Sequence, residues 1–167
     1  GLRRAQAISV IDLAIVLTFD DPATPGDCYI IEVLSPQDTT GYSQYRFCVF
    51  APDASVETPG GDIADAETCL DNDGIFLRDA LFNGKRKELK IYVNSGNISS
   101  QYFGIDTLYS SVKLIHVPEA YLRYKQTRKI ANNSDGNPFA EPANVFTNVN
   151  EGYGIFSVIS TSDAVIR

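Results

Sequence analysis

His116 is the only histidine in the chain, so any Ser-His-Asp or Cys-His catalytic arrangement would have to use it. Within the extended segment Thr107–Val117 it alternates with Val112 and Leu114, which puts the three side chains on one face. The next element begins at Pro118, so we expect His116 to be a hydrogen-bonded residue at the edge of the core, with a catalytic base as the alternative. The chain has no G-x-S-x-G, H-E-x-x-H or phosphate-binding-loop motif, and we expect no catalytic residues and no cofactor.

Three cysteines, Cys28, Cys48 and Cys69, could supply a nucleophile, a metal ligand or a disulfide. Zinc sites use close pairs such as C-x2-C, and these cysteines are far apart in the sequence. Cys28 and Cys48 lie in apolar segments, where a free thiol packs as a small hydrophobic group. One disulfide could form in an oxidising compartment, but the sequence does not fix its pairing. We therefore expect buried or paired structural thiols rather than a reactive nucleophile.

The segment Cys69–Gly74 resembles the start of a calcium-binding loop. With Gly74 at loop position six, Asp71 and Asp73 occupy positions three and five. The pattern fails at both ends, because Cys69 stands at position one and Ala80 at position twelve, where carboxylates are needed. We expect a polar turn and no metal, with weak calcium binding as the alternative.

Two carboxylates, Asp12 and Glu32, interrupt hydrophobic strands. Each is expected to point outward from a half-buried strand. The alternative is an acid of a carboxylate-dependent hydrolase, since a pair of such groups hydrolyses glycosides. The nine tyrosines and nine phenylalanines leave stacking on a sugar ring open.

The chain is acidic, with a formal net charge of −7. This charge disfavours nucleic acid and anionic membranes as partners. The one basic cluster, Lys85 to Lys87, is followed directly by Glu88 and is expected to be a solvated turn, with an anion site as the alternative. No apolar run approaches the ~20 residues that a membrane-spanning helix needs.

Strand-forming patterns dominate the chain. The expected strands are Ile8–Phe19, Cys28–Leu34, Tyr42–Phe50, Gly74–Phe82, Glu88–Val93, Thr107–Val117, Ala143–Val149 and Tyr153–Ile159. We expect the first three to form an antiparallel meander and Asn83-Gly84 to turn a hairpin. Residues 51–73 are the least regular part, and this acidic loop is a candidate contact region.

One helix is predicted over Pro118–Ala131. Proline suits the first helical position, and Arg128 and Lys129 near the end complement the helix dipole. By helical spacing, Ala120, Tyr121, Tyr124 and Ala131 share a face. The predicted fold is mainly β, an antiparallel β-sandwich or flattened barrel with one short α-helix near residues 118–131, in a single domain over residues 1–167.

The stretch from this helix onward resembles the C-terminal signature of the domain-of-unknown-function 4249 family, a group of Bacteroidetes envelope lipoproteins. The matching features are a tyrosine-rich helix, a PFAEP segment, an Asn-to-Gly turn and a G-hydrophobic-F strand. They are Tyr121, Tyr124, Pro138, Phe139, Ala140, Glu141, Pro142, Asn148, Val149, Gly152, Gly154, Ile155 and Phe156. Upstream, the segments FDDPATPGDCYIIEV and LFNGKRKELKIYV are also similar. Departures from the family pattern are Pro118, Leu122 and Cys28.

The resemblance implies an exported protein with a lipid anchor at the outer membrane, periplasmic or at the cell surface. The family has no assigned activity, and its members are often encoded near TonB-dependent receptors. Family members are longer, so we expect this chain to be the C-terminal part of a lipoprotein whose N-terminal module and lipid anchor are absent. The anchor would be its contact with the membrane.

The expected function is a non-enzymatic envelope module that binds a protein partner, such as a TonB-dependent receptor, or a glycan as an accessory of uptake. The alternatives are an unrecognised carboxylate-dependent hydrolase and a purely architectural domain. A platform of exposed tyrosines or an exposed apolar patch would favour binding, whereas a cleft with two carboxylates would favour hydrolysis.

Overall fold

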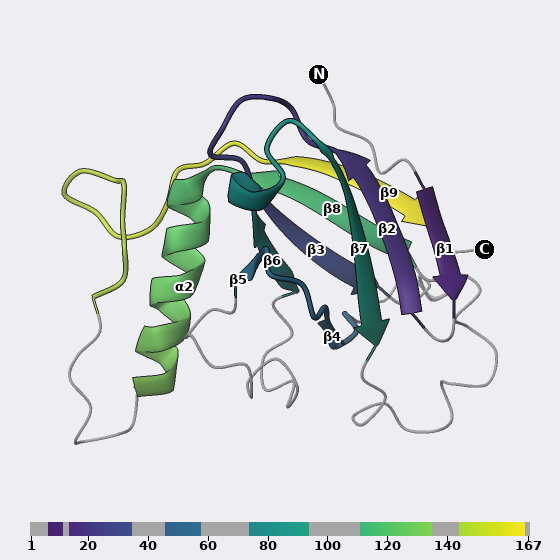
Figure 1. The fold of residues 1–167 in the computed structure, drawn as a ribbon. Coiled ribbons are helices and arrows are strands. Elements are labelled where there is room, and N and C mark those ends of the chain that lie inside the picture. Colours follow the sequence, from purple (N-terminus) through teal and green to yellow (C-terminus); the bar gives the residue numbers. More distant parts are fainter. Residues whose placement is uncertain are drawn as a thin grey trace.

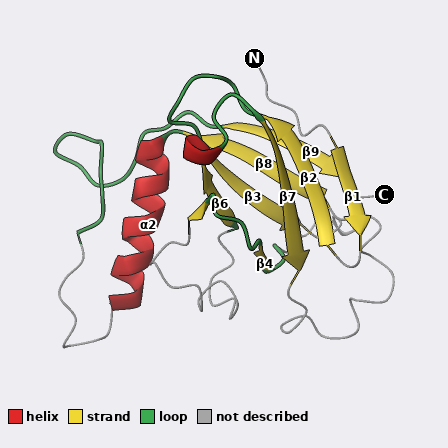
Figure 2. Cartoon of the chain, viewed as in Figure 1, coloured by secondary structure: helices red, strands yellow, loops and turns green. Residues whose placement is uncertain are grey.

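A computed structural model describes residues 7–11, 14–34, 46–57, 74–93, 111–134 and 144–165. Its strands form two antiparallel sheets (Figures 1 and 2). The first sheet has the order β1-β2-β7-β4, from Ala7–Ile11, Ala14–Asp20, Arg86–Val93 and Val49–Phe50. The second has the order β5-β6-β3-β8-β9, from Val56–Glu57, Ile75–Arg78, Cys28–Leu34, Ser111–Val117 and Ser160–Val165. One helix, α2 (Glu119–Ser134), follows β8. The predicted mainly β, sandwich-like fold with one helix is confirmed.

The core between the sheets follows from period-two alternation. In β3, Tyr29, Ile31 and Val33 face the opposite sheet, which contributes Leu17 and Leu89 among others. These side chains are almost completely buried, and each large one contributes about 1.5–3 kcal/mol of hydrophobic stabilisation. Period-two alternation therefore accounts for the inner faces of β3 and β7.

A second apolar layer lies on the outer face of the five-stranded sheet. There Ile30, Phe76 and Val117 pack against Leu122 of α2, and Tyr121 packs at the edge of this cluster. β3 is thus buried on both faces, which explains why it is hydrophobic apart from Glu32. The predicted inward helix face was partly wrong: Leu122 is fully buried, while Ala120, Tyr124 and Ala131 are half-buried.

The predicted single strand Ile8–Phe19 is two strands. β1 and β2 are antiparallel neighbours, with Ile11 opposite Ala14, so the chain reverses at residues 12 and 13. Asp12 was the visible signal, but it was interpreted as an outward-facing side chain within one strand. Asp12 itself lies outside the described residues.

The predicted meander and the predicted Asn83-Gly84 hairpin were also wrong. β2 and β3 belong to different sheets, as do β6 and β7. Between β6 and β7 the chain passes through a short 3-10 helix, Asp79–Leu81, before the turn at Gly84. Gly84 has φ +70°, as the turn signal implied, but the turn carries the chain from one sheet to the other.

The two predicted final strands, Ala143–Val149 and Tyr153–Ile159, are not strands in the described part of the chain. Residues 144–159 instead form a looped segment that projects beside α2 and then returns past the start of the helix to β9 (Figure 1). The last strand is β9, whose polar sequence STSDAV lacked an apolar alternation that would have predicted it. β9 forms one edge of the five-stranded sheet.

Candidate functional site

The first group of polar side chains lies at the end of the sandwich where β2, β3 and β7 meet loops. Asp21 is buried, and its two oxygens accept hydrogen bonds from the hydroxyl of Tyr29 and the backbone N–H of Gly84, the latter at 2.9 Å. The Tyr29 ring is fully buried among Phe19 and Phe82, with ring centroids 5.0 and 6.2 Å away. Asp21 therefore ties the β2–β3 loop to the turn before β7.

Asp79 makes the matching connection to the other end of the same loop. It is 4 % exposed, and its Oδ2 accepts the N–H groups of Gly26 and Asp27 at 2.9 and 3.0 Å. Asp27 in turn accepts a hydrogen bond from Nε2 of His116 at 2.8 Å, and the His116 ring lies 5.5 Å from that of Tyr29. His116 therefore has the hydrogen-bonded position at the core edge that its strand pattern predicted.

Asp21, Asp27 and Asp79 each offer an oxygen atom within 4.8 Å of the others. Oxygen ligands suit a hard cation, but calcium takes six to eight of them. The oxygens of Asp21, and Oδ2 of Asp79, already accept protein hydrogen bonds, and both residues are buried. We assign this cluster a structural role, in which carboxylates satisfy the N–H groups of a turn.

Of the two carboxylate candidates from the sequence, Asp12 lies outside the described residues and Glu32 does not belong to this cluster. Glu32 lies on β3, pairs with Arg46 at 2.8 Å and stands opposite Lys113 of β8. It faces the outer side of the five-stranded sheet, as expected, although it is 9 % exposed and more buried than an outward position implied. The calcium-like segment 69–73 lies outside the described residues, as does most of the acidic loop 51–73.

The basic cluster is divided between two ion pairs. Arg86 pairs with Asp20 at the surface, and Nζ of Lys87 lies 2.7 Å from an oxygen of Asp53. Burial raises the pKa of Asp53, but hydrogen bonds from Lys87 and Ser55 outweigh it and hold that pKa below its ordinary value. The prediction of a solvated turn was wrong for Arg86 and Lys87, which begin β7, and their carboxylate partners favour a structural role over an anion site.

The cysteines differ in state. Cys28 is a free, buried thiol beside α2, and desolvation raises its pKa to about 11. A thiol that ionises so late is a poor nucleophile at neutral pH. Cys48 is disulfide-bonded, and its partner is outside the described residues. The prediction of buried or paired thiols holds for both; Cys69 lies outside the described residues.

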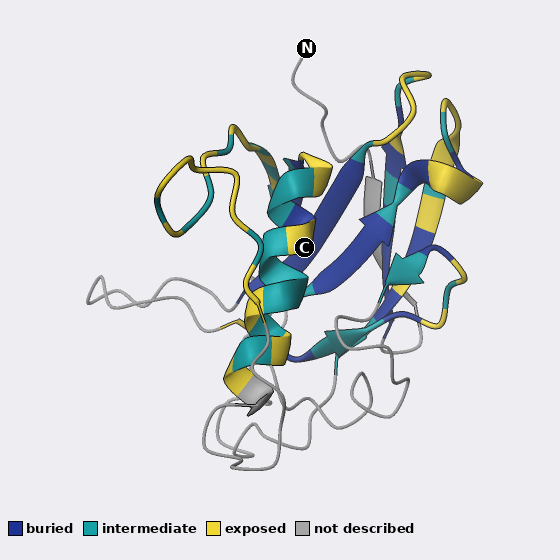
Figure 3. Cartoon of the chain, turned by 90° about the vertical axis from the view of Figure 1, so that its left-hand side faces the viewer, coloured by how far each residue is buried: buried dark blue, intermediate teal, exposed yellow. Residues whose placement is uncertain are grey.

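The feature most suggestive of binding is the projecting segment 144–159, which we call the apolar arm. Eight large hydrophobic side chains are exposed among the described residues, and six of them lie here. They are Val145, Val149, Tyr153, Phe156, Val158 and Ile159. Tyr153 is fully exposed, and Phe156 and Val158 are about four-fifths exposed, as the yellow colouring of this region reflects in Figure 3.

The apolar arm is attached to α2 by specific contacts. The N–H of Phe146 donates to Oγ1 of Thr127 at 2.8 Å, and the guanidinium of Arg123 lies 4.8 Å from the Phe146 ring centroid. Farther along the arm, the Asn148 side chain bonds both the N–H and the carbonyl of Phe156 at 2.8 Å. These contacts hold the arm in one conformation beside the helix.

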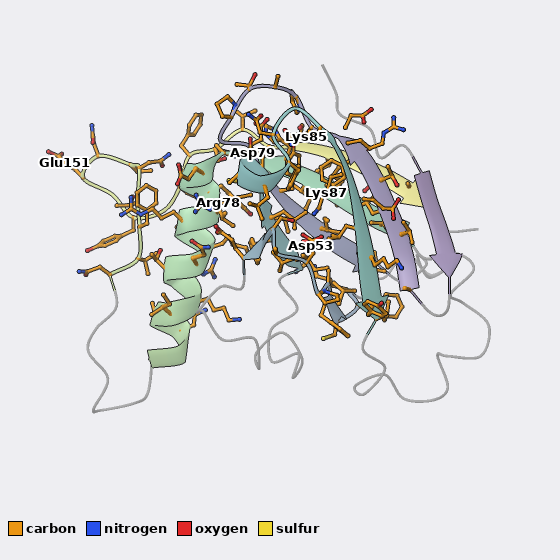
Figure 4. All side chains as sticks on the ribbon, in the orientation of Figure 1. Asp53, Arg78, Asp79, Lys85, Lys87 and Glu151 are labelled. Atoms are coloured by element: carbon orange, nitrogen blue, oxygen red, sulfur yellow. The ribbon has the colours of Figure 1, made fainter. Side chains whose placement is uncertain are left out.

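Sequence reasoning identified the residues of the apolar arm but not their exposure. Their alternation is typical of half-buried strands, and the segments Ala143–Val149 and Tyr153–Ile159 were predicted to be strands. The sequence did contain a sign that these residues are not strands, namely the several Asn and Gly residues between Asn144 and Gly154. Both residue types are uncommon in β-strands. In Figure 4 the arm is marked by Glu151, its only charged residue.

Comparisons with protein-family models, curated proteins and solved structures found no match to this chain. Among the described residues no helix combines the length and apolar character that a membrane span requires.

Proposed function

We propose that this chain is a non-enzymatic module of the cell envelope that binds a protein partner through the apolar arm. The observation that carries the proposal is the exposure of Tyr153, Phe156 and Val158 on a segment held in place by its own hydrogen bonds. Exposed apolar side chains gathered in one region mark interaction sites in soluble proteins. An ordered arm also loses less conformational entropy on binding than a loose one.

A protein partner fits the chemistry of the apolar arm better than a glycan does. Sugars stack on aromatic faces, which Tyr153 and Phe156 could offer. Four of the six exposed side chains are aliphatic, namely Val145, Val149, Val158 and Ile159. Their burial is favourable against any apolar surface and needs no ring, so they match the apolar centre of a protein interface.

The proposed location is the outer membrane, on its periplasmic or external side. The disulfide at Cys48 supports an oxidising compartment, because cytosolic thiols are kept reduced. Together with the resemblance described above, this makes an outer-membrane receptor of the TonB-dependent type the leading candidate partner.

The test is site-specific photocrosslinking in the native envelope. A photoreactive phenylalanine analogue replaces Tyr153 in one variant and Leu81 in a control, since Leu81 is also exposed but lies on the 3-10 helix. We expect a receptor-sized adduct only from position 153, and its loss when Phe156→Ser and Val158→Ser are added. Identical adducts from both positions, or none from position 153, would overturn the proposal.

A further inference from the structure

The last part of the apolar arm, residues 155–159, is extended although it belongs to neither sheet. It contains no turn or bend and leads directly into β9 (Figure 1). At Phe156 the N–H and the carbonyl both bond to the side chain of Asn148. The two groups therefore point to the same side, as they do in a residue of a β-strand. We call residues 155–159 the edge segment.

The side chains of the edge segment alternate between exposed and half-buried positions. Phe156 and Val158 are about four-fifths exposed, whereas Ile155 and Ser157 are half-buried. The alternation ends at Ile159, which is 46 % exposed. The segment thus offers one apolar face to solvent and turns the other toward the protein.

One backbone edge of this segment carries hydrogen-bonding groups that no protein group satisfies. In an extended chain, successive residues point their N–H and C=O groups to opposite edges. Ile155, Ser157 and Ile159 therefore point away from the edge at which Asn148 bonds Phe156. Within the described part of the chain, the backbone groups of these three residues form no hydrogen bond. Buried backbone groups are almost always paired, so we expect these groups to contact water, which another strand can replace.

The composition of the edge segment also suits strand pairing. Residues 152–160 contain no charged residue and no proline, and the Ile, Phe and Val residues among them are strong strand formers. Exposed strand edges in natural proteins usually carry charges or prolines, which prevent pairing with another chain. The edge segment has neither, so nothing in its sequence opposes the addition of a strand.

Resting on the proposed function, we infer that the partner contributes an extended peptide segment that adds a strand to residues 155–159. Its backbone bonds the edge formed by Ile155, Ser157 and Ile159, and its apolar side chains, at alternate positions, cover Phe156 and Val158. Main-chain hydrogen bonds supply the affinity in this mode of recognition, so a short segment suffices. A second copy of this chain fits less well, because a stable interface between two folded proteins uses about 20–30 residues a side.

The test uses a random peptide library displayed on phage. Peptides are selected on the wild-type chain and counter-selected on the Phe156→Ser/Val158→Ser double variant, so that only ligands of the apolar arm survive. One survivor is then synthesised with an N-methyl group at each backbone position in turn, and its affinity is measured by fluorescence anisotropy. N-methylation removes one backbone donor and leaves every side chain in place.

We expect the sensitivity to N-methylation to alternate along the peptide. Methylation at positions whose N–H faces the edge segment should weaken binding by about threefold to tenfold, and methylation at the intervening positions should leave binding unchanged. Uniform losses, or none, would overturn strand addition and leave binding by the apolar arm intact. If no peptide depends on the arm, the inference and the proposed function both fail.

Two substitutions of Ser157 test the same edge from the side of the protein. Its Oγ is buried without a hydrogen-bond partner, so Ser157→Ala removes no bond and keeps the backbone N–H, whereas Ser157→Pro removes that N–H. We expect Ser157→Ala to bind the selected peptide like wild type and Ser157→Pro to bind it at least about threefold more weakly. Equal binding by both variants would overturn the inference. So would a wild-type dimer in sedimentation that Ser157→Pro abolishes, because a second copy would then occupy the edge.

Discussion

Asn148 holds Phe156 by both of its backbone groups. The side-chain oxygen accepts the N–H of Phe156 and the side-chain nitrogen donates to its carbonyl, each at 2.8 Å. The two bonds resemble the paired N–H and C=O bonds between antiparallel strands, and they join residues that are eight positions apart in the sequence. Thr147 reinforces the turn by donating to the carbonyl of Gly152. The Asn148 amide therefore joins the two ends of the loop in the apolar arm.

Replacing Asn148 by alanine should loosen the apolar arm without unfolding the protein. Each hydrogen bond contributes about 0.5–1.5 kcal/mol, and the arm is not part of either sheet. Hydrogen exchange followed by mass spectrometry should show faster exchange at residues 148–156 and unchanged exchange in β3. Asn150→Ala, a change at an exposed neighbouring position, is the control. Equal exchange in wild type and Asn148→Ala would show that these bonds do not order the arm.

The Cys28 thiol should be unreactive in the folded protein. Its burial raises the pKa to about 11 from an ordinary value near 9, so the contribution of the neutral thiol to folding stability is fully present below pH 9 and is lost as the pH rises through 11. Iodoacetamide at pH 8 should label Cys28 only after unfolding, as counted by intact mass. A Cys28→Ala variant should lose less stability between pH 9 and 11 than wild type does. Labelling of the native protein within minutes would contradict this.

Acid should weaken the contact between Asp53 and Lys87. The pKa of Asp53 lies below its ordinary value, since the hydrogen bonds from Lys87 and Ser55 outweigh its desolvation. The stabilisation is therefore present above about pH 4 and is lost as the pH falls through the native pKa. Asp53→Asn should cost about 1 kcal/mol at pH 7 and less at pH 3, measured by urea unfolding.

The control for Asp53 is Asp20→Asn, because Asp20 pairs with Arg86 at a more exposed site. That variant should change stability less than Asp53→Asn does, because solvent screens the exposed pair. If the cost of Asp53→Asn did not decrease between pH 7 and pH 3, the ion pair would not be the source of its stabilisation.

Local patterns predicted the elements better than their pairing. The alternation of Tyr29, Ile31 and Val33 fixed the inner face of β3, and the Pro118 signal placed the start of α2 within one residue. Sheet assignment depends on contacts between segments distant in sequence, such as β2 with β7. The periodicity of a segment does not indicate which distant strand it pairs with. The meander was predicted because neighbouring strands often pair, and long-range packing produced a different pairing.

The polar cluster shows the same limit at the level of single residues. The loop DDPATPGD was visible as a turn, and Asp27 and His116 were visible as polar residues. The loop is held by Asp79, which lies more than fifty residues farther along the chain and accepts the N–H groups of Gly26 and Asp27. No motif near Asp79 in the sequence indicates that it makes these bonds. Exposure of the apolar arm was equally hidden, because alternation looks the same whether the partner surface is a sheet or another molecule.

Replacing Asp79 should destabilise the whole sandwich end. Its Oδ2 accepts the N–H groups of Gly26, which is exposed and can bond water instead, and of Asp27, which is half-buried and would lose its acceptor in Asp79→Ala. A buried unsatisfied group costs about 1–3 kcal/mol, and only the N–H of Asp27 is shielded from water, so Asp79→Ala should lower stability by about 1–3 kcal/mol. For a chain of this size each kcal/mol corresponds to about 2–4 °C in Tm.

Calorimetry of Asp79→Ala and of wild type with and without calcium separates two roles of the cluster. If the carboxylates serve the loop alone, the variant should melt lower under every condition, and calcium should leave the wild-type Tm unchanged. A rise in the wild-type Tm with calcium that Asp79→Ala lacks would instead identify Asp21, Asp27 and Asp79 as a cation site. In that case the hydrogen bonds between these carboxylates and the loop would orient the carboxylate oxygens toward the cation, in addition to holding the turn.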